Sequence, residues 1–184
     1  MKKVNIIILG LNTVDRKILE YVCKYLSEKI FYCDCEIIES LTLEPHFYNK
    51  LREQYDSDLI LNWIAQKTKT YKANVILGIG DFDAYADNLN FIFGEAYPKN
   101  HVCAVYLGRL KTSDNNLYNE RIIKEVIHEI GHALGLQHCP NPECVMYFSR
   151  TINDTDHKKP MYCKKCSQIL IKNNIPLKTY EPKL

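Results

Sequence analysis

Hydrophobic residues along this chain form short continuous runs and longer, helically spaced runs, and the two kinds alternate. Aliphatic runs at 4–9 and 75–78 predict strands that are covered on both faces, and residues 33–38 predict another strand. Residues 91–96 and 102–107 predict two more strands, joined by a proline-containing turn. Strands joined by a short turn run antiparallel, whereas strands joined through helices run parallel. We therefore expect an α/β fold with a mixed, twisted sheet and helices.

Helical spacing of apolar residues predicts two long helices in the first half of the chain. The first covers residues 14–29 with Thr13 as its N-cap, and the second covers residues 57–70 with Ser57 as its N-cap. The side of the second helix that we expect to be buried consists of Leu59, Ile60, Trp63 and Ile64. A further helix is expected from about Glu120, after a polar loop, because apolar residues recur on one side of it.

Three imidazoles and a glycine lie at offsets that can build one metal site on this last helix. His128 and His132 are four residues apart, so on a helix their side chains share a face and can bind one Zn²⁺. His138 would supply the third ligand, because Gly135 can adopt the left-handed conformation that ends the helix and returns the chain toward the metal. A fourth coordination position then remains for water, as in catalytic zinc sites.

Glu129 follows His128 and would lie close to the metal without being one of its ligands. Zinc lowers the pKa of a bound water to about 7, and a neighbouring carboxylate can take its proton as the water attacks a carbonyl carbon. The spacing therefore predicts that Glu129 acts as a general base in amide hydrolysis.

The same residues resemble a known family signature. The spacing His128-Glu129-x-x-His132-x-x-Gly135-x-x-His138 resembles that of the metzincin zinc peptidases. With Cys139-x-x-x-x-Cys144-x-Met146 and Cys163-x-x-Cys166 added, it is similar to the narrower archaemetzincin pattern. The resemblance implies a metzincin-like fold and a zinc-dependent metalloprotease that acts on peptide or protein substrates.

The resemblance also implies roles for residues outside the zinc ligands. Met146 would be the Met-turn residue, an apolar floor beneath the three histidines. Many metzincins have a tyrosine two residues after this methionine; Phe148 stands there, so Tyr147 is the candidate to stabilise an oxyanion. Residues 91–96 would be the edge strand that holds the substrate backbone in extended form.

Four cysteines after the active helix form two short-spaced pairs that are typical of a structural zinc site: Cys139, Cys144, Cys163 and Cys166. Four thiolates close the coordination sphere, so this second zinc would be structural. We expect nearby lysines to balance its negative charge: Lys158, Lys159, Lys164 and Lys165. Two disulfides are the alternative arrangement, which a reducing compartment disfavours. The remaining cysteines are expected to pack as small apolar residues: Cys23, Cys33, Cys35 and Cys103.

Composition adds few constraints to this interpretation. A hydrophobic fraction of 46% and a charged fraction of 25% are ordinary for a globular protein. The net charge of +2 gives no reason to expect a nucleic-acid or membrane partner. No apolar run approaches the ~20 residues of a membrane-spanning helix. We expect a cytoplasmic monomer.

The motifs together predict a division of the 184 residues into two parts. Residues 1–138 would form the catalytic α/β subdomain, and residues 139–184 a small zinc-stabilised C-terminal subdomain that carries Met146. The catalytic zinc would lie in a cleft between them, giving two zinc ions per chain. An alternative is a non-enzymatic zinc-stabilised module that binds protein or nucleic acid, but it leaves Glu129 without a role.

Overall fold

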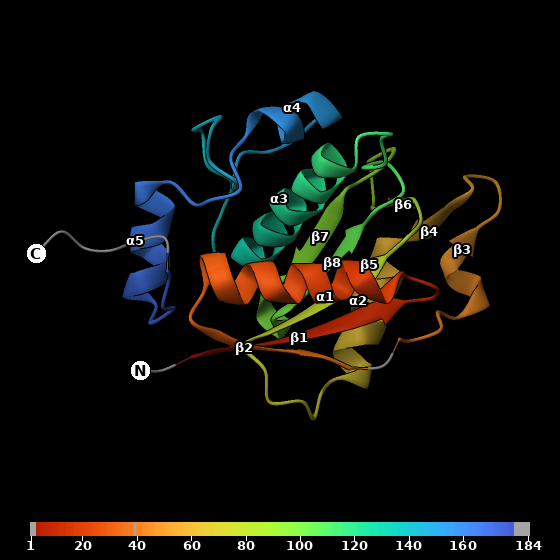
Figure 1. The fold of residues 1–184 in the computed structure, drawn as a ribbon. Coiled ribbons are helices and arrows are strands. Elements are labelled where there is room, and N and C mark those ends of the chain that lie inside the picture. Colours follow the sequence, from red (N-terminus) through yellow and green to blue (C-terminus); the bar gives the residue numbers. More distant parts are fainter. Residues whose placement is uncertain (1–2, 39, 179–184) are drawn as a thin grey trace, which may run out of the picture.

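A five-stranded mixed sheet forms the centre of the molecule (Figure 1), whose computed structural model describes residues 3–38 and 40–178. Its strands, in order across the sheet, are β2 (Cys33–Ile37), β1 (Val4–Leu11), β5 (Val75–Gly80), β8 (Val102–Tyr106) and β7 (Gly94–Tyr97). The first four run parallel, and β7 pairs antiparallel with β8 at the edge. The predicted mixed α/β sheet is confirmed.

A second, small sheet lies next to the start of the edge strand. It consists of β3 (Tyr48–Asn49), β4 (Gln54–Asp56) and β6 (Ala84–Tyr85), and a short 3-10 turn at Pro45–Phe47 precedes it. Ile92 forms a bridge to Ala84 of β6. The predicted strand at 91–96 therefore starts later than expected, because Ile92 pairs with the small sheet and the strand β7 begins at Gly94.

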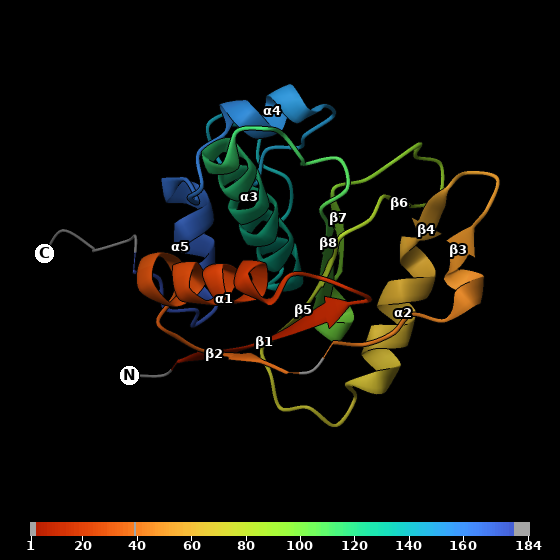
Figure 2. The same ribbon diagram turned by 45° about the vertical axis from the view of Figure 1, so that its right-hand side comes forward.

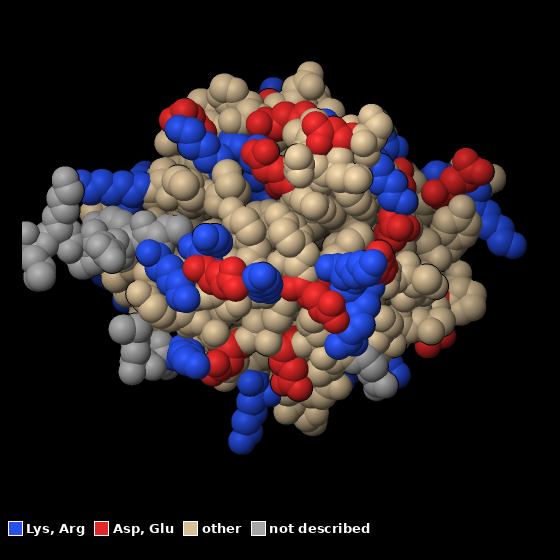
Figure 3. Space-filling model, viewed as in Figure 1, with Lys and Arg blue, Asp and Glu red and all other residues tan. Residues whose placement is uncertain are grey.

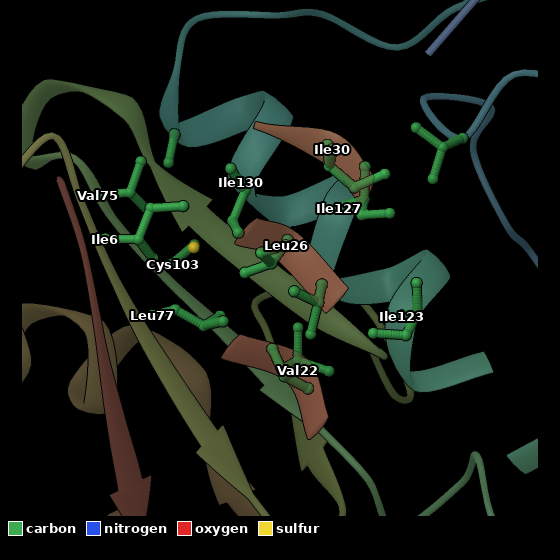
Figure 4. Close-up of a cluster of buried hydrophobic side chains, with 14 of the residues drawn as sticks. Ile6, Val22, Leu26, Ile30, Val75, Leu77, Cys103, Ile123, Ile127 and Ile130 are labelled. Carbon is green, nitrogen blue, oxygen red and sulfur yellow. The ribbon is translucent and has the colours of Figure 1, made fainter. Parts of the chain in front are cut away.

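Helices cover both faces of the central sheet (Figures 1 and 2). α1 (Arg16–Tyr25) and α3 (Asn115–Ala133) pack on one face, and α2 (Ser57–Lys67) packs on the other. Figure 4 shows the first of these two cores, in which side chains of β1, β5 and β8 meet those of α1, the turn after it and α3. The residues of this cluster that it labels are Ile6, Val22, Leu26, Ile30, Val75, Leu77, Cys103, Ile123, Ile127 and Ile130.

The first two helices are capped by aspartates instead of the predicted hydroxyl residues. The side chain of Asp15 accepts a hydrogen bond from the Lys17 amide and caps α1, whereas Thr13 does not. α1 continues into a π-helical turn at Leu26–Ile30. Asp56 caps α2. Ser57 is unavailable as a cap because its hydroxyl forms a buried 2.7 Å hydrogen bond with that of Tyr106.

Two other predictions about the helices are wrong in detail. On α2, Leu61 is buried while Leu59 is 38% exposed, so the apolar face is rotated from the one expected. α3 begins at Asn115, about five residues earlier than predicted, because Asp114 accepts hydrogen bonds from the amides of Asn116 and Leu117.

The chain after α3 packs against the sheet domain and contributes to the same core. It contains α4 (Ile152–His157) and α5 (Lys164–Lys172). Buried side chains of this segment, such as Leu170, belong to the core cluster of α1 and the sheet. The division of the chain at residue 138 stays a prediction. Part of the predicted C-terminal subdomain, residues 179–184, lies outside the described residues.

Two of the four cysteines expected to pack as free thiols are covalently joined. Cys23 of α1 and Cys35 of β2 form a disulfide with Cα atoms 5.7 Å apart. Their side chains meet because α1 lies against β2, a tertiary contact that the spacing in sequence does not reveal. Cys33 and Cys103 are free, and Cys103 is fully buried in the core as predicted.

Charged side chains of both signs are interspersed on the face of the molecule shown in Figure 3. Exposed ion pairs of the molecule include Arg16–Glu20 on α1 and Lys3–Asp34. Among the helices of the described residues, we find none with the length and apolarity needed to traverse a bilayer.

Candidate metal centre and active site

The three predicted histidines meet at the C-terminal end of α3. His128 and His132 lie one turn apart on the same face, with their Nε2 atoms 3.1 Å apart. His138 lies beside both rings, and one nitrogen from each of the three lies within 4.8 Å of the others. The structure thus brings together the residues that the spacing selected.

Gly135 returns the chain toward the histidines as predicted. Its φ angle is +94°, and it is the glycine with positive φ among the described residues. The amide of Gly135 donates to the carbonyl of His132, and the amide of Leu136 donates to that of Gly131, which together form a Schellman helix end. This tight end allows His138 to reach the face that carries His128 and His132.

Two backbone carbonyls orient the histidine rings. Nδ1 of His128 donates to the carbonyl of Val145 at 2.7 Å, and Nδ1 of His132 donates to that of Leu136 at 2.8 Å. Burial lowers the pKa of His132 to about 4 and that of His128 well below its usual range, so both rings are neutral at pH 7. With the proton on Nδ1, each Nε2 presents a lone pair.

These lone pairs make the site suitable for a cation. Two unprotonated ring nitrogens 3.1 Å apart repel each other unless a positive charge lies between them. In a tetrahedral site with Zn–N bonds of about 2.0–2.1 Å, the ligand nitrogens are about 3.3 Å apart. His128 and His132 therefore fit a zinc ion in both protonation state and spacing, and His138 brings a third ring nitrogen within 4.8 Å of theirs.

Glu129 is buried next to this centre on α3, with 4% of its surface exposed. Burial raises the pKa of its carboxyl group well above the usual range, and the carboxylates of Glu125 and Glu95 raise it further. Lys158 acts in the opposite direction and favours the ionised form of Glu129. A carboxyl group held in this way at a cation site is suited to accept and return a proton.

A buried ion pair beneath the site was not predicted from the sequence. Lys158 is fully buried, and its Nζ lies 3.0 Å from Oε1 of Glu125, one turn before Glu129 on α3. The hydroxyl of Thr155 donates to the same oxygen at 2.9 Å. The prediction that Lys158 balances the cysteine thiolates is wrong, because its ammonium group pairs with the Glu125 carboxylate. The sequence does contain a sign of this pair, because Glu125 and Glu129 are two carboxylates four residues apart on a buried helix face and call for a cation nearby.

Lys159 likewise forms an ion pair with a residue other than the cysteines. It forms an exposed pair with Glu143 at 2.9 Å. Lys164 and Lys165 are exposed in the first turn of α5. Adjacency in sequence therefore did not identify the partner of Lys159, and charge balancing by Lys164 and Lys165 stays a prediction.

Met146 is completely buried and lies against Gly131 of α3. Its carbonyl accepts a hydrogen bond from the amide of Cys139 at 2.9 Å, which joins the segment after His138 to the segment around Met146. Phe148 packs against the ring of His138 with a centroid distance of 4.9 Å. Phe148 lines the cavity described below, whereas Tyr147 is not among its lining residues.

The four C-terminal cysteines form a second cluster in which all four sulfur atoms lie within 4.8 Å of one another. The Sγ atoms of Cys139 and Cys163 are 3.8 Å apart, as are those of Cys144 and Cys166. A tetrahedron with Zn–S bonds of about 2.3 Å has edges of about 3.8 Å. All four are free cysteines, so the alternative of two disulfides is not what the structure contains.

A cavity of about 570 Å³ opens over the histidines. Its lining includes the start of β7, His128 and Glu129 of α3, and residues 148–150. Outside the catalytic groups, much of the lining is apolar, including Leu89, Phe91 and Phe93.

Comparison with known proteins agrees with this geometry. The sequence pattern described as peptidase family M54 matches residues 1–172. The archaemetzincin of Pyrococcus furiosus is 42% identical over 159 residues, which cover 79% of this chain and 83% of the relative. The archaemetzincin of Pyrococcus abyssi is 38% identical over 180 residues, which cover 91% and 95% of the two chains.

Solved structures with the same fold include two archaemetzincins. The crystal structure of the protein from Methanopyrus kandleri superposes with a TM-score of 0.83 at 30% identity and covers 94% of this chain and 96% of that one. The protein from Archaeoglobus fulgidus, crystallised with malonate, gives a TM-score of 0.74 at 34% identity and covers 89% and 98%. The chain therefore belongs to peptidase family M54, the archaemetzincins, and is a zinc metallopeptidase.

Proposed function

We propose that this chain hydrolyses peptide bonds with a zinc ion held by His128, His132 and His138, and with Glu129 as the general base. The observation that carries the proposal is the pair of carbonyl-bound imidazoles whose unprotonated Nε2 atoms face each other 3.1 Å apart. When bound, zinc supplies a Lewis acid that acidifies water and polarises the scissile carbonyl. Membership in a peptidase family favours this function over the non-enzymatic binding module that the cysteine pairs also allowed.

The chain's own groups then move the proton and hold the substrate. Glu129 takes a proton from the attacking water and returns it to the leaving amine nitrogen. Its burial excludes bulk water from the transfer, and its position next to His128 keeps it at the cation site. Phe93 and Phe148 of the cavity lining provide apolar surface for the substrate.

The substrate backbone would extend the central sheet at β7. β7 is the last strand on this side of the five-stranded sheet among the described residues. An extended peptide that pairs with its outer edge gains backbone hydrogen bonds independent of sequence. The edge-strand role that the sequence assigned to residues 91–96 is thus proposed for Gly94–Tyr97.

A second zinc at Cys139, Cys144, Cys163 and Cys166 would be structural. The sulfur spacing of 3.8 Å in two pairs supports this assignment, and four thiolates leave no open position for water. We therefore propose two zinc ions per chain.

The test compares wild type with Glu129→Gln and Glu129→Ala on a library of unstructured peptides, with zinc content measured for each protein. We expect two zinc ions per chain in all three and loss of turnover by about 10²-fold or more in both variants. Glu120→Gln, on the solvent-exposed side of the same helix, is the matched control and should retain turnover. Turnover in Glu129→Gln equal to that of the control would exclude the general-base role.

A further inference from the structure

We propose that Gly94 is a positioning residue for Glu129 and that the peptide bond next to the substrate residue paired with Gly94 is the one that is cleaved. The inference deepens the proposed function and depends on Glu129 being the general base. It assigns a role to a residue of the edge strand that sequence spacing did not select.

Gly94 is the residue of β7 against which the side chain of Glu129 packs. A Cβ atom at residue 94 would lie 2.6 Å from Cγ and 2.8 Å from Oε1 of Glu129. It would also lie 2.7 Å from the carbonyl oxygen of Ala104 on β8, which is backbone and cannot rotate away. Any side chain at this position must therefore displace the Glu129 carboxyl group, the strand pairing, or both.

The backbone conformation does not explain the glycine. Gly135 is the described glycine with a positive φ angle, so Gly94 has a conformation that other residues can adopt. Within an edge strand, a glycine without this need costs stability relative to alanine. A glycine is required at residue 94 for steric reasons, because the Glu129 carboxyl group fills the space that a side chain would need.

The register of β7 and β8 shows which backbone groups of the edge strand are available. The amide of Tyr106 donates to the carbonyl of Phe93, and the pairing continues as Gly94 with Val105 and Glu95 with Ala104. In an antiparallel ladder, hydrogen-bonded and non-hydrogen-bonded pairs alternate. The N–H and C=O groups of Gly94 and Ala96 therefore point away from β8, toward the free edge.

This register locates the reacting bond relative to the strand. A substrate strand on the free edge would form hydrogen-bonded pairs with Gly94 and Ala96, two residues apart. The Glu129 carboxyl lies directly against Gly94, so one peptide group of the residue paired with Gly94 lies within its reach. The substrate residue that pairs with Ala96 is two positions away from this one and is not part of the cleaved peptide bond.

The first test is a double-mutant cycle at residues 94 and 129. Gly94→Ala is expected to lower kcat/KM by about 10²-fold or more by moving the carboxyl group. Asp is one methylene shorter than Glu and makes room for the new methyl group. In a Glu129→Asp background, Gly94→Ala should therefore cost at least about 10-fold less than it does with Glu129 present, and the loss that remains is that of the contact with the Ala104 carbonyl. Equal losses from Gly94→Ala in both backgrounds would overturn the positioning role.

Gly108→Ala is the matched control for the general cost of a methyl group in a tight glycine site. Its Cβ would lie 2.7–2.8 Å from backbone atoms of Phe82 and Asp83, away from Glu129. We expect it to lower the melting temperature while kcat per zinc-loaded molecule stays within about 3-fold of wild type. If Glu129→Gln is inactive and Gly94→Ala matches Gly108→Ala in kcat, this inference fails while the proposed function stands.

A second test uses the wild-type protein, so it does not depend on the folding of a variant. A cleavable peptide is N-methylated at one residue at a time, which removes one strand hydrogen bond in each peptide. The register predicts that KM rises about 10-fold or more at two residues separated by one tolerant residue, with one of the two flanking the cleaved bond. A uniform response along the peptide would overturn the assigned register.

Discussion

Gly131 of the active helix lies directly against Met146, so closely that a Cβ atom on Gly131 would overlap the methionine Sδ. The same atom would lie 3.1 Å from the ring of Tyr162, whose hydroxyl donates to the Ile127 carbonyl at 2.8 Å. The helix that carries two candidate zinc ligands thus packs against Met146 and Tyr162 at a residue without a side chain.

Gly131→Ala is therefore expected to destabilise the protein by about 1–3 kcal/mol through overpacking, despite the higher helix propensity of alanine. Urea unfolding measures the change. Met146→Ala removes the overlapping sulfur, so the double variant should be less destabilised than the sum of the single variants. Additive effects of the two substitutions would show that the contact does not limit the helix position.

Lys158→Met should be strongly destabilising because it leaves the Glu125 carboxylate buried without its cation. Breaking a buried pair in this way costs about 3–5 kcal/mol. Lys159→Met is a control at the next residue, since the Lys159–Glu143 pair is exposed and worth no more than about 1 kcal/mol. Chemical denaturation of both variants gives the comparison, and similar losses would contradict the importance of the buried pair.

Glu95 should make stability depend on pH. Burial, followed by the nearby Asp58, Asp56 and Asp87 carboxylates, raises the pKa of Glu95 from 4.5 to about 7. Between these two pH values the folded chain holds a proton that the unfolded chain has released, so the free energy of unfolding falls as pH rises. After allowance for partial exposure of the side chain, we expect about 1–2 kcal/mol.

Glu95→Gln removes this titration and should flatten the decline between about pH 4.5 and 7. Unfolding in urea at several pH values, for wild type and variant, isolates the contribution because all other titrating groups are shared. A difference between the two proteins that does not change with pH would refute the elevated pKa.

Cys163→Ser is expected to remove one zinc equivalent per chain and to lower the melting temperature, because the short C-terminal segment has little core of its own. Metal analysis and thermal unfolding measure both effects. Cys33→Ser is the control, since Cys33 is a free cysteine outside the cluster. Two zinc equivalents in purified Cys163→Ser would contradict the structural-zinc assignment.

Local spacing was sufficient to predict much of the candidate site. The i, i+4 relation of His128 and His132 and the left-handed turn at Gly135 depend on helix geometry alone, so both followed from the sequence. The strands of the parallel sheet were also recognisable, because an aliphatic run buried on both faces has a distinct pattern.

Features that depend on tertiary contacts could not be predicted in the same way. Lys158 finds Glu125 only because α4 docks on α3, and Cys23 meets Cys35 only because α1 lies against β2. The cap of α2 was misassigned because the competing hydroxyl of Ser57 is used by Tyr106, 49 residues away in sequence. Gly94 was missed because its φ angle is ordinary and its importance comes from a side chain on another element.

A single peptide bond joins His138 to Cys139, and the Cys139 amide is held by the Met146 carbonyl. The two candidate ion sites are thus linked through adjacent residues, the shortest connection that a polypeptide permits. Neither His138 nor Cys139 can move by the length of a residue without moving the other. We expect the two metal ions to bind cooperatively in the natural chain. A glycine inserted between His138 and Cys139 would let each site form independently, so the two ions would then bind without cooperativity.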